Sequence, residues 1–589
     1  MMLKLIRLRF QFLRQLLRGE RSFFCFHFLI AFLLFIWGVI ICLHYGRIGF
    51  MPLDQSIVFD GAWRLLCHQL PGRDFIIPYG LVPIYLQAFF FKIFGINWFS
   101  YCFHAAIFNG LFSIAIYIIL ILLDTPRLLS FFYALLSAII FYPPFGVPYM
   151  DQHSWFFSIL ALLTAILIPK TSARSIKISL IFLNGAFFLA AFFSKPIPAL
   201  FFFFIILLPI LFYSPKSILR PNLLSTISSL FLIFFLVIII LWLAGFKPIN
   251  FITNSILTPL GLGKERLIFY QDCYPPIVLL SALFYPKPFE PFSLRLFSYF
   301  LIYLTIVSFI IKIIILTRKS RIAALSFIKK NSNPLFMVIL SLSLLIASNL
   351  FILLTLNQGE NGLPILFLSL GLVHISFLKL GSADNRQPWP SKRNHNFKPV
   401  LITFIFVLTG LVDAISFNHQ VNRTRIVHDM IIDPKVTAGK DSLPLELQFM
   451  KFATPSKYDF QANNLKNLVQ YLKKHRANFF LLGDSSIIYG LTRRPSLNPA
   501  LWFHPGLSIP YADTVAFDEY EKKLLQNLKK YRARFLVIEG KATWYNLHLD
   551  CFKRLSTLII PNASENRHFG SFKVYRIDLA KINSTSLSY

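Results

Sequence analysis

The stretch FFCFHFLIAFLLFIWGVIICLHY, residues 23–45, decides how this chain must fold. It contains no Asp, Glu, Lys or Arg. It is also long enough to cross a bilayer core, which needs about 20 apolar helical residues. A basic segment precedes it, as in a signal peptide, but the apolar run is too long for one and lacks an A-x-A cleavage pattern. We therefore interpret residues 23–45 as a transmembrane helix.

The rest of the chain repeats this character. Of 589 residues, 56% are hydrophobic and 14% are charged, whereas a soluble domain is roughly 45 to 50% apolar and about 25% charged. This composition excludes both a soluble globular enzyme and a disordered chain. We predict a multi-pass α-helical membrane protein with about eleven spans, at residues 23–45, 99–123, 129–147, 154–169, 178–194, 197–213, 223–245, 296–317, 335–356, 363–380 and 399–416.

The basic residues indicate orientation rather than nucleic-acid binding. The formal net charge is +32, from 58 basic and 26 acidic residues, but many of the basic residues lie in alternate loops between spans. The positive-inside rule places these loops in the cytosol. They carry Lys4, Arg7, Arg9, Arg14, Arg18, Arg21, Arg127, Lys170, Arg174, Lys177, Lys216, Arg220, Arg318, Lys319, Arg321, Lys329, Lys330, Arg386, Lys392, Arg393 and Lys398.

This orientation defines the domain organisation. Residues 1–22 form a cytosolic basic N-terminus, residues 23–416 form the membrane domain, and residues 417–589 lie outside. Two long external segments, 46–98 and 246–295, interrupt the membrane domain. The apolar run 81–94 in the first of them is too short for an ordinary span, so we expect an interfacial or re-entrant helix there.

The region 417–589 is predicted to be a soluble α/β domain. Helical periodicity at 464–475 and 517–531 is followed each time by a strand-like run, at 478–483 and 534–540, and an alternating strand lies at 572–577. No glycine-rich phosphate motif opens a helix, which argues against a nucleotide site. The six cysteines show no CxxC pairing, so we expect neither a zinc site nor a disulfide framework.

Carboxylates cluster where the chain leaves its first span. The segment MPLDQSIVFDGAWRLLCHQLPGRDF, residues 51–75, contains Asp54, Asp60 and Asp74. One interpretation is that they are solvated loop acids, with Asp54 as the N-cap of the following helix. The other is that one of them is a general base, since deprotonating an acceptor requires a positioned group of suitable pKa. Spacing does not decide between these alternatives.

The same segment, with PYGLVPIYLQAFFFKIFG at 78–95, resembles the first external loop of the GT-C superfamily of polyprenyl-phosphate-dependent glycosyltransferases. It is most similar to the bacterial members related to protein O-mannosyltransferases and the lipid A aminoarabinose transferase. Three matching features carry the resemblance: an acid, a helix with A-x-R-L-L, and a turn with P-x-R-D-F. In this chain they are Asp54, Ala62 to Leu66, and Pro71 to Phe75. The segments 483–495 and 502–507 resemble the family's external domain more weakly.

The resemblance implies roles for particular residues. Asp54 corresponds to the base, and Asp60, Asp74 and Asp151 to acids of the acceptor site or cavity. Lys195, Lys264 and Arg266 are implied to bind the donor phosphate, although each could be an ordinary interfacial charge. Asp151 could likewise be a helix N-cap. This chain departs from the family pattern at the residue after Asp54, where Gln55 replaces a frequent second acid.

The implied function is transfer of a sugar from a polyprenyl phosphate to a lipid, glycan or protein at the external face of the inner membrane, with inversion at the anomeric carbon. The external domain would then be periplasmic. No cofactor is indicated, and the sequence does not settle whether a divalent metal assists. A transporter or flippase of a lipid-linked sugar is the alternative, although no inverted repeat of broken spans supports it. A receptor or structural protein that presents the C-terminal domain is a third interpretation.

Overall fold

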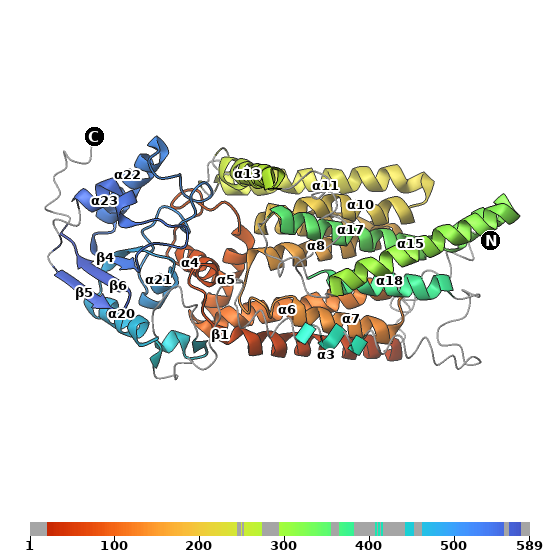
Figure 1. Cartoon of the computed structure of the whole chain (residues 1–589), viewed down its shortest axis with the longest axis horizontal. Coiled ribbons are helices and arrows are strands. Elements are labelled where there is room, and N and C mark those ends of the chain that lie inside the picture. The colour runs from red at the N-terminus through yellow and green to blue at the C-terminus, as the bar shows by residue number, and fades with distance from the viewer. Residues whose placement is uncertain are drawn as a thin grey trace.

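Apolar helices form an elongated bundle, and a small α/β domain covers one end of it (Figure 1). The computed structural model describes residues 21–243, 245, 249, 252–273, 294–354, 364–381, 407–408, 410–412, 414–415, 442–452, 462–558, 563 and 565–578. The helices of the bundle and its surface are α3 (Arg21–Gly46), α6 (Trp98–Leu122), α7 (Arg127–Ile140), α8 (Met150–Leu167), α9 (Arg174–Ser194), α10 (Pro196–Tyr213), α11 (Lys216–Leu243), α13 (Thr258–Cys273), α15 (Leu294–Lys319), α16 (Arg321–Lys330), α17 (Ser332–Leu354) and α18 (Leu366–Gly381).

Eight of the described helices are long and apolar enough to cross a membrane: those within α3, α6, α8, α9, α10, α11, α15 and α17. They correspond to eight of the eleven predicted spans, so the multi-pass helical membrane fold is confirmed. The predicted spans 129–147 and 363–380 coincide with the shorter helices α7 and α18, of 14 and 16 residues. Most of the predicted span 399–416 lies outside the described residues.

Small residues allow the first two long helices to approach each other closely. A Cβ atom built on Gly38 of α3 would lie only 2.6 Å from the Cα of Gly110 in α6. Beside this contact, the Asn109 side-chain amide donates hydrogen bonds to the carbonyls of Gly38 and Ala138, at 2.8 and 2.9 Å. Helix pairs in membranes commonly use small residues and polar bonds in this way, because no hydrophobic force drives helices together in lipid.

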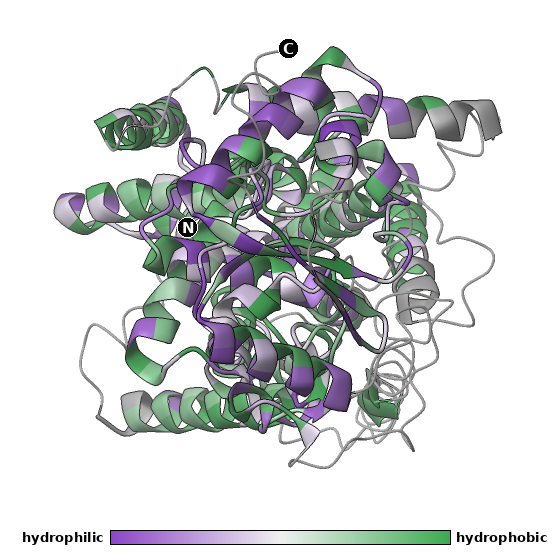
Figure 2. Ribbon diagram, turned by 90° about the vertical axis from the view of Figure 1, so that its left-hand side faces the viewer, coloured by the Kyte–Doolittle hydropathy of each residue, from purple (hydrophilic) through white to green (hydrophobic). Residues whose placement is uncertain are grey.

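The C-terminal domain is an α/β layer, as predicted. Its sheet has the order β3-β4-β6-β5, in which β3 and β4 are parallel and the other neighbours are antiparallel. Figure 2, viewed onto this end, shows many hydrophilic segments in the layer nearest the viewer and apolar helices behind. The elements are α20 (Ala462–His475), β3 (Asn478–Leu482), α21 (Ile487–Thr492), α22 (Val515–Lys530), β4 (Ala533–Glu539), α23 (Lys553–Leu558), β5 (Glu565–Phe569) and β6 (Phe572–Arg576).

Helices α4 (Asp54–Leu66) and α5 (Leu81–Phe94) lie between the bundle and the C-terminal domain (Figure 1). The run expected to be an interfacial helix is therefore helical and lies at this end of the bundle. Apolar side chains of α4, α5 and the C-terminal domain share one hydrophobic core, to which Phe59, Ile84 and Leu465 belong. A short parallel pair of strands, β1 (Ile48–Gly49) and β2 (Lys451–Phe452), adds a second connection.

A buried arginine fastens α4 to the C-terminal domain. Arg64 is 1% exposed, and its Nε lies 2.9 Å from the carboxylate of Asp60. Its two terminal nitrogens donate to the carbonyls of Asn498 and Ala500, at 2.7 and 3.0 Å. The guanidinium also covers the ring of Phe75 at 4.8 Å. The two terminal nitrogens of Arg64 thus connect α4 to the C-terminal domain, while its Nε is paired within α4.

The opposite end of the bundle carries basic residues. Helix α6 begins beside the C-terminal core at Trp98 and ends at Leu122, whose carbonyl accepts a hydrogen bond from Lys170. Lys379 donates to the nearby carbonyl of Asp124 at 3.0 Å. A helix of 25 residues spans about 37 Å, so these contacts lie at the far side of the bundle. This end is the one that the charge pattern predicts to face the cytosol.

Candidate functional site

Asp54 is the first residue of α4 and lies in a polar cluster rather than in an open loop. The residue in the N-cap position is Leu53, and no side chain caps this helix end. The N-cap interpretation of Asp54 is therefore wrong. Burial and the nearby charge of Asp151 raise the pKa of Asp54 to about 6, while Lys195 and a hydrogen bond with Tyr149 act in the opposite direction.

Asp151 and Lys195 form an ion pair beside Asp54. Asp151 is a fully buried residue in the first turn of α8, and its Oδ1 lies 2.5 Å from the Nζ of Lys195. Lys195 occupies the break between α9 and α10, where its carbonyl accepts a hydrogen bond from the Ser154 hydroxyl at 2.9 Å. The N-cap interpretation of Asp151 is also wrong, because Tyr149 precedes α8 and no side chain caps it.

Aromatic rings surround the ammonium group of Lys195. Its Nζ lies 5.3 Å from the ring centres of both Tyr79 and Phe351, a range in which a cation is attracted to the ring face. Tyr79 also contacts Trp502 of the C-terminal domain, at 5.6 Å between ring centres. The ammonium group of Lys195 is consequently shielded in part from water by these rings. Through Tyr79, its surroundings extend to the C-terminal domain.

Tyr149 forms a hydrogen bond with Asp54 and also interacts electrostatically with Asp151. Its ring stacks on Phe145 at 4.5 Å. Burial raises the pKa of Tyr149 well above its usual value, and the charges of Asp54 and Asp151 raise it further, so the phenol stays protonated and can donate to Asp54. We call Asp54, Tyr79, Tyr149, Asp151 and Lys195 the Asp54 cluster.

Gln55, at the position where the resemblance predicts a second acid, makes two hydrogen bonds that hold the local structure. Its Oε1 accepts a hydrogen bond from the backbone N–H of Met51 at 2.9 Å. Its Nε2 donates to the carbonyl of Phe145, also at 2.9 Å. A carboxylate could not make the second bond, because an ionised carboxylate has no hydrogen to donate. Gln55 therefore positions the loop that carries Phe145 and Tyr149 against the start of α4.

The other two predicted acids lie outside the Asp54 cluster. Asp60 pairs with Arg64, and burial raises its pKa although Arg64 opposes the shift. Asp74 lies in the turn after α4 and accepts hydrogen bonds from Arg73 and the Leu70 N–H. Partial burial would raise the pKa of Asp74, but these bonds outweigh it and the pKa is lowered. Both acids stabilise the first loop in this structure.

The two predicted cations of the second external segment are on α13. Lys264 is exposed there, and the side chain of Arg266 lies outside the described residues. Their neighbour Glu265 lies beside Tyr511 of the C-terminal domain, whose pKa is raised by burial and by that carboxylate. Of the predicted cations whose side chains the structure describes, Lys195 is the one that lies near Asp54.

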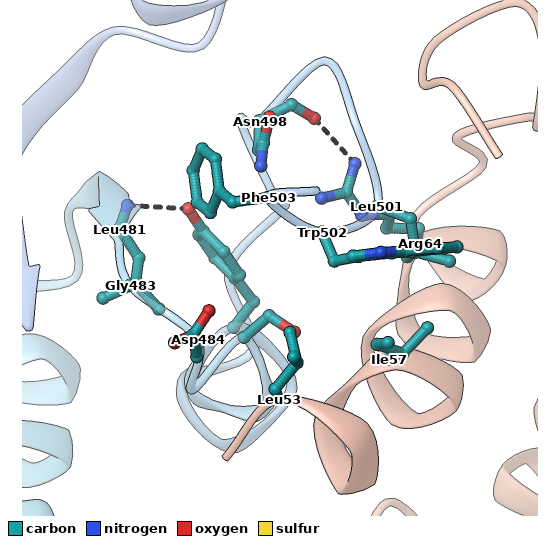
Figure 3. A pocket seen from close by; sticks show the side chains of 12 residues that line it. Leu53, Ile57, Arg64, Leu481, Gly483, Asp484, Asn498, Leu501, Trp502 and Phe503 are labelled. Atoms are coloured by element: carbon teal, nitrogen blue, oxygen red, sulfur yellow. Dashed lines mark hydrogen bonds between the residues drawn. The ribbon is translucent and has the colours of Figure 1, made fainter. Parts of the chain in front are cut away.

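A small cavity separates the start of α4 from the C-terminal domain (Figure 3). Its lining includes Leu53, Ile57, Asp484 and Trp502, and its volume is about 10 Å³, which is room for about one water molecule. Asp484 follows β3 and accepts a hydrogen bond from the Trp544 N–H at 2.7 Å. The loop after β3 therefore lies near Leu53, the residue that precedes Asp54. The cavity itself is too small for a sugar.

Sequence reasoning missed the aromatic members of the Asp54 cluster. Tyr149 precedes Asp151 by two positions in a segment already singled out, but it is one of 23 tyrosines in a chain with 67 phenylalanines. Nothing in the spacing separates it from ordinary packing residues. Within the described part of the chain, no three His, Cys, Asp or Glu side chains come together as a metal site. The expectation that no cofactor is needed stays a prediction.

Comparisons with known proteins give a likeness to solved structures. No protein-family model and no curated protein matches the chain. Among solved structures, it is similar to the Archaeoglobus fulgidus oligosaccharyltransferase, whose crystal structure is a complex with Zn and sulfate. The match has 11% sequence identity and a TM-score of 0.42, and it covers 94% of this chain and 74% of that chain. A TM-score below 0.5 does not establish a shared fold.

Proposed function

We propose that this protein is a glycosyltransferase that moves a sugar from a polyprenyl-phosphate donor to an acceptor at the external face of the membrane. The observation that carries the proposal is the position of Asp54, whose pKa is raised to about 6, beside the ion pair of Asp151 and Lys195 at the membrane end of the C-terminal domain. A strongly shifted carboxyl group next to a specific charge partner is typical of catalytic sites.

Asp54 acts as the general base. A base works best when its pKa lies near the operating pH, because it must be ionised and yet hold the proton that it removes. With a pKa of about 6, Asp54 is roughly 90% ionised at pH 7. An ordinary exposed aspartate has a pKa near 3.9, about two units lower, and would therefore be a weaker base. The environment of Asp54 therefore suits deprotonation of a hydroxyl or amine acceptor.

Lys195 stabilises the charge of the donor phosphate. An ammonium group has three N–H donors, and Asp151 engages Lys195 at one point. The remaining donors are available to phosphate oxygens, and their attraction is strengthened because the aromatic rings around Lys195 exclude water. Lys264 and Arg266 on α13 would add to this attraction as the donor approaches.

The reaction is a single displacement. The acceptor atom attacks the anomeric carbon and gives its proton to Asp54. The bond between that carbon and the phosphate oxygen breaks, its electron pair leaves with the polyprenyl phosphate, and Lys195 offsets the negative charge on that oxygen. Attack opposite to the leaving group inverts the anomeric carbon. The donor phosphate already activates the sugar, so no nucleotide is required.

The distribution of basic residues supports an external site. The far end of the bundle carries Lys170 and Lys379, whereas the Asp54 cluster lies at the end that is covered by the C-terminal domain. The positive-inside rule then puts the cluster and that domain outside the cytosol. The implied partners are a lipid-linked donor, a lipid, glycan or protein acceptor and the bilayer itself, and no nucleic acid is expected.

Transfer by purified protein in liposomes tests the proposal. We expect label from a radiolabelled polyprenyl-phosphate sugar to move to an acceptor, and the rate to fall at least 100-fold in Asp54→Asn. The control is Asp513→Asn, which changes an exposed carboxylate paired with Lys553 and should keep the rate. Movement of the intact lipid-linked sugar across the bilayer, without bond cleavage, would instead identify a transporter.

A further inference from the structure

The first turns of α8 contain polar side chains that are fully buried and unsatisfied. Gln152, Trp155 and Ser158 are all 0% exposed. In the described part of the chain, both amide atoms of Gln152, the indole nitrogen of Trp155 and the hydroxyl of Ser158 make no hydrogen bond, and neither does Oδ2 of Asp151. Native proteins leave few such groups without a partner, and each calls for a water molecule, an ion or a ligand.

These groups share one side of the helix. Positions 151, 155 and 158 follow each other at intervals of four and three residues, which places them on one helical face, and position 152 adjoins it. His153, on another side of α8, is bonded to both Tyr142 and His104, at 2.5 and 3.0 Å. The unsatisfied groups are therefore concentrated on one face, which we call the α8 polar face (Asp151, Gln152, Trp155 and Ser158).

The α8 polar face continues from the Asp54 cluster into the bundle. The ring of Trp155 contacts Phe202 of α10 and Phe351 of α17, each at 5.6 Å between ring centres. Phe351 is also one of the two rings beside the ammonium of Lys195. A ligand whose phosphate binds Lys195 would thus place the group attached to that phosphate next to Trp155 and Gln152. Polar groups within membrane helices are costly and usually functional.

The hydrogen-bonding pattern of this face selects the type of ligand. Trp155 can only donate, an ionised Asp151 can only accept, and Gln152 and Ser158 can do both. An ionised phosphate only accepts hydrogen bonds, so it cannot satisfy the acceptor oxygens of Asp151 and Gln152. Sugar hydroxyl groups both donate and accept, so a row of hydroxyls can satisfy every member of the face.

We infer that the α8 polar face binds the sugar of the lipid-linked donor, with Gln152 and Trp155 contacting its hydroxyl groups while Lys195 holds the phosphate. This inference rests on the proposed function, and it adds the residues that distinguish a glycosylated lipid from the bare polyprenyl phosphate. Specificity for the sugar then originates on a membrane helix.

Ligand-dependent thermal stability tests the inference without requiring turnover. The full-length protein in nanodiscs is heated with polyprenyl phosphate, with the same lipid carrying glucose, mannose, N-acetylglucosamine or arabinose, and with each free monosaccharide. For the wild type, we expect at least one glycosylated lipid to bind more tightly than the bare lipid.

Trp155→Phe, which removes the N–H but keeps a ring, should weaken that binding roughly 2- to 10-fold. Gln152→Leu should do the same, and both variants should bind the bare lipid as the wild type does.

A matched tryptophan separates a binding role from a folding role. The indole nitrogen of Trp98 donates to the carbonyl of Gly46 at 3.0 Å, so Trp98→Phe should lower the melting temperature without ligand. Trp155→Phe removes packing but no protein hydrogen bond, so it should lower the melting temperature less than Trp98→Phe does. Equal binding of the glycosylated lipids by the wild type and by both α8 variants would overturn the inference, even if Asp54→Asn abolishes transfer as the proposed function requires. Wild-type protein that does not prefer any glycosylated lipid to the bare lipid would overturn it as well.

Discussion

The rate of sugar transfer should fall at low pH because one carboxyl group, Asp54, becomes protonated. Its pKa is about 6, and only the ionised form can accept the proton of the acceptor. At pH 5 roughly 10% of Asp54 would be ionised, so kcat/KM should be about tenfold below its plateau, and it should fall about tenfold for each further pH unit. Above pH 7 the rate should be nearly independent of Asp54, since the base is then almost fully ionised.

Two neighbouring variants should move this acid limb in opposite directions. Asp151 raises the pKa of Asp54, whereas Lys195 lowers it. Asp151→Asn should therefore shift the limb to lower pH, and Lys195→Met should shift it to higher pH, whatever either change does to the maximal rate. The sign follows from charge alone, because a neighbouring anion disfavours the carboxylate and a neighbouring cation favours it.

The assay is the initial rate of sugar transfer in liposomes between pH 4.5 and pH 8, at donor concentrations well below KM. In that regime the profile reports the free protein, which is the state that the structure describes. Asp513→Asn should leave the profile unchanged. A flat acid limb in the wild type, or a limb that stays in place in both neighbouring variants, would refute the assignment of Asp54 as the base.

Three further predictions concern stability and topology. Arg64→Met leaves a carboxylate buried and unpaired, so we expect a loss of about 3 to 5 kcal/mol, measured by thermal or denaturant unfolding in detergent; an unchanged midpoint would contradict the fastening role of this arginine. Gln55→Glu removes the bond to Phe145 and should destabilise the protein by about 1 to 3 kcal/mol. An unfolding curve of this variant that coincides with the wild-type curve would contradict the prediction. In cells, Asp513→Cys should react with an impermeant thiol reagent from outside and Ser320→Cys only after permeabilisation; reversed labelling would place the Asp54 cluster in the cytosol.

The membrane helices were predictable because hydropathy is a property of the sequence alone. A run of apolar side chains must be buried in lipid or protein wherever it lies, so eight long helices occur close to their predicted bounds. Helix α7 stops at Ile140, before the predicted end at 147, because the segment 141–149 contains three prolines and forms the turn that carries Tyr149. The paired strands β1 and β2 have two residues each and leave no detectable pattern.

The Asp54 cluster was only partly predictable, since it depends on tertiary contacts. Asp54, Asp151 and Lys195 are spread over 141 positions of the chain, and their spacing does not predict that they lie together. The three acids of the first loop look alike in sequence, yet Asp60 is held by Arg64 and Asp74 by Arg73. The burial that raises the pKa of Asp54 is supplied by the surrounding fold, which no local pattern encodes.

The most direct measurement of the central claim is an experimental structure of Asp54→Asn in nanodiscs with a non-hydrolysable polyprenyl-phosphonate sugar. We expect the phosphonate within hydrogen-bond distance of the Nζ of Lys195 and the anomeric carbon beside the side chain at position 54. A phosphonate bound at the opposite end of the bundle, or one that leaves Lys195 paired only with Asp151, would contradict the proposed transferase.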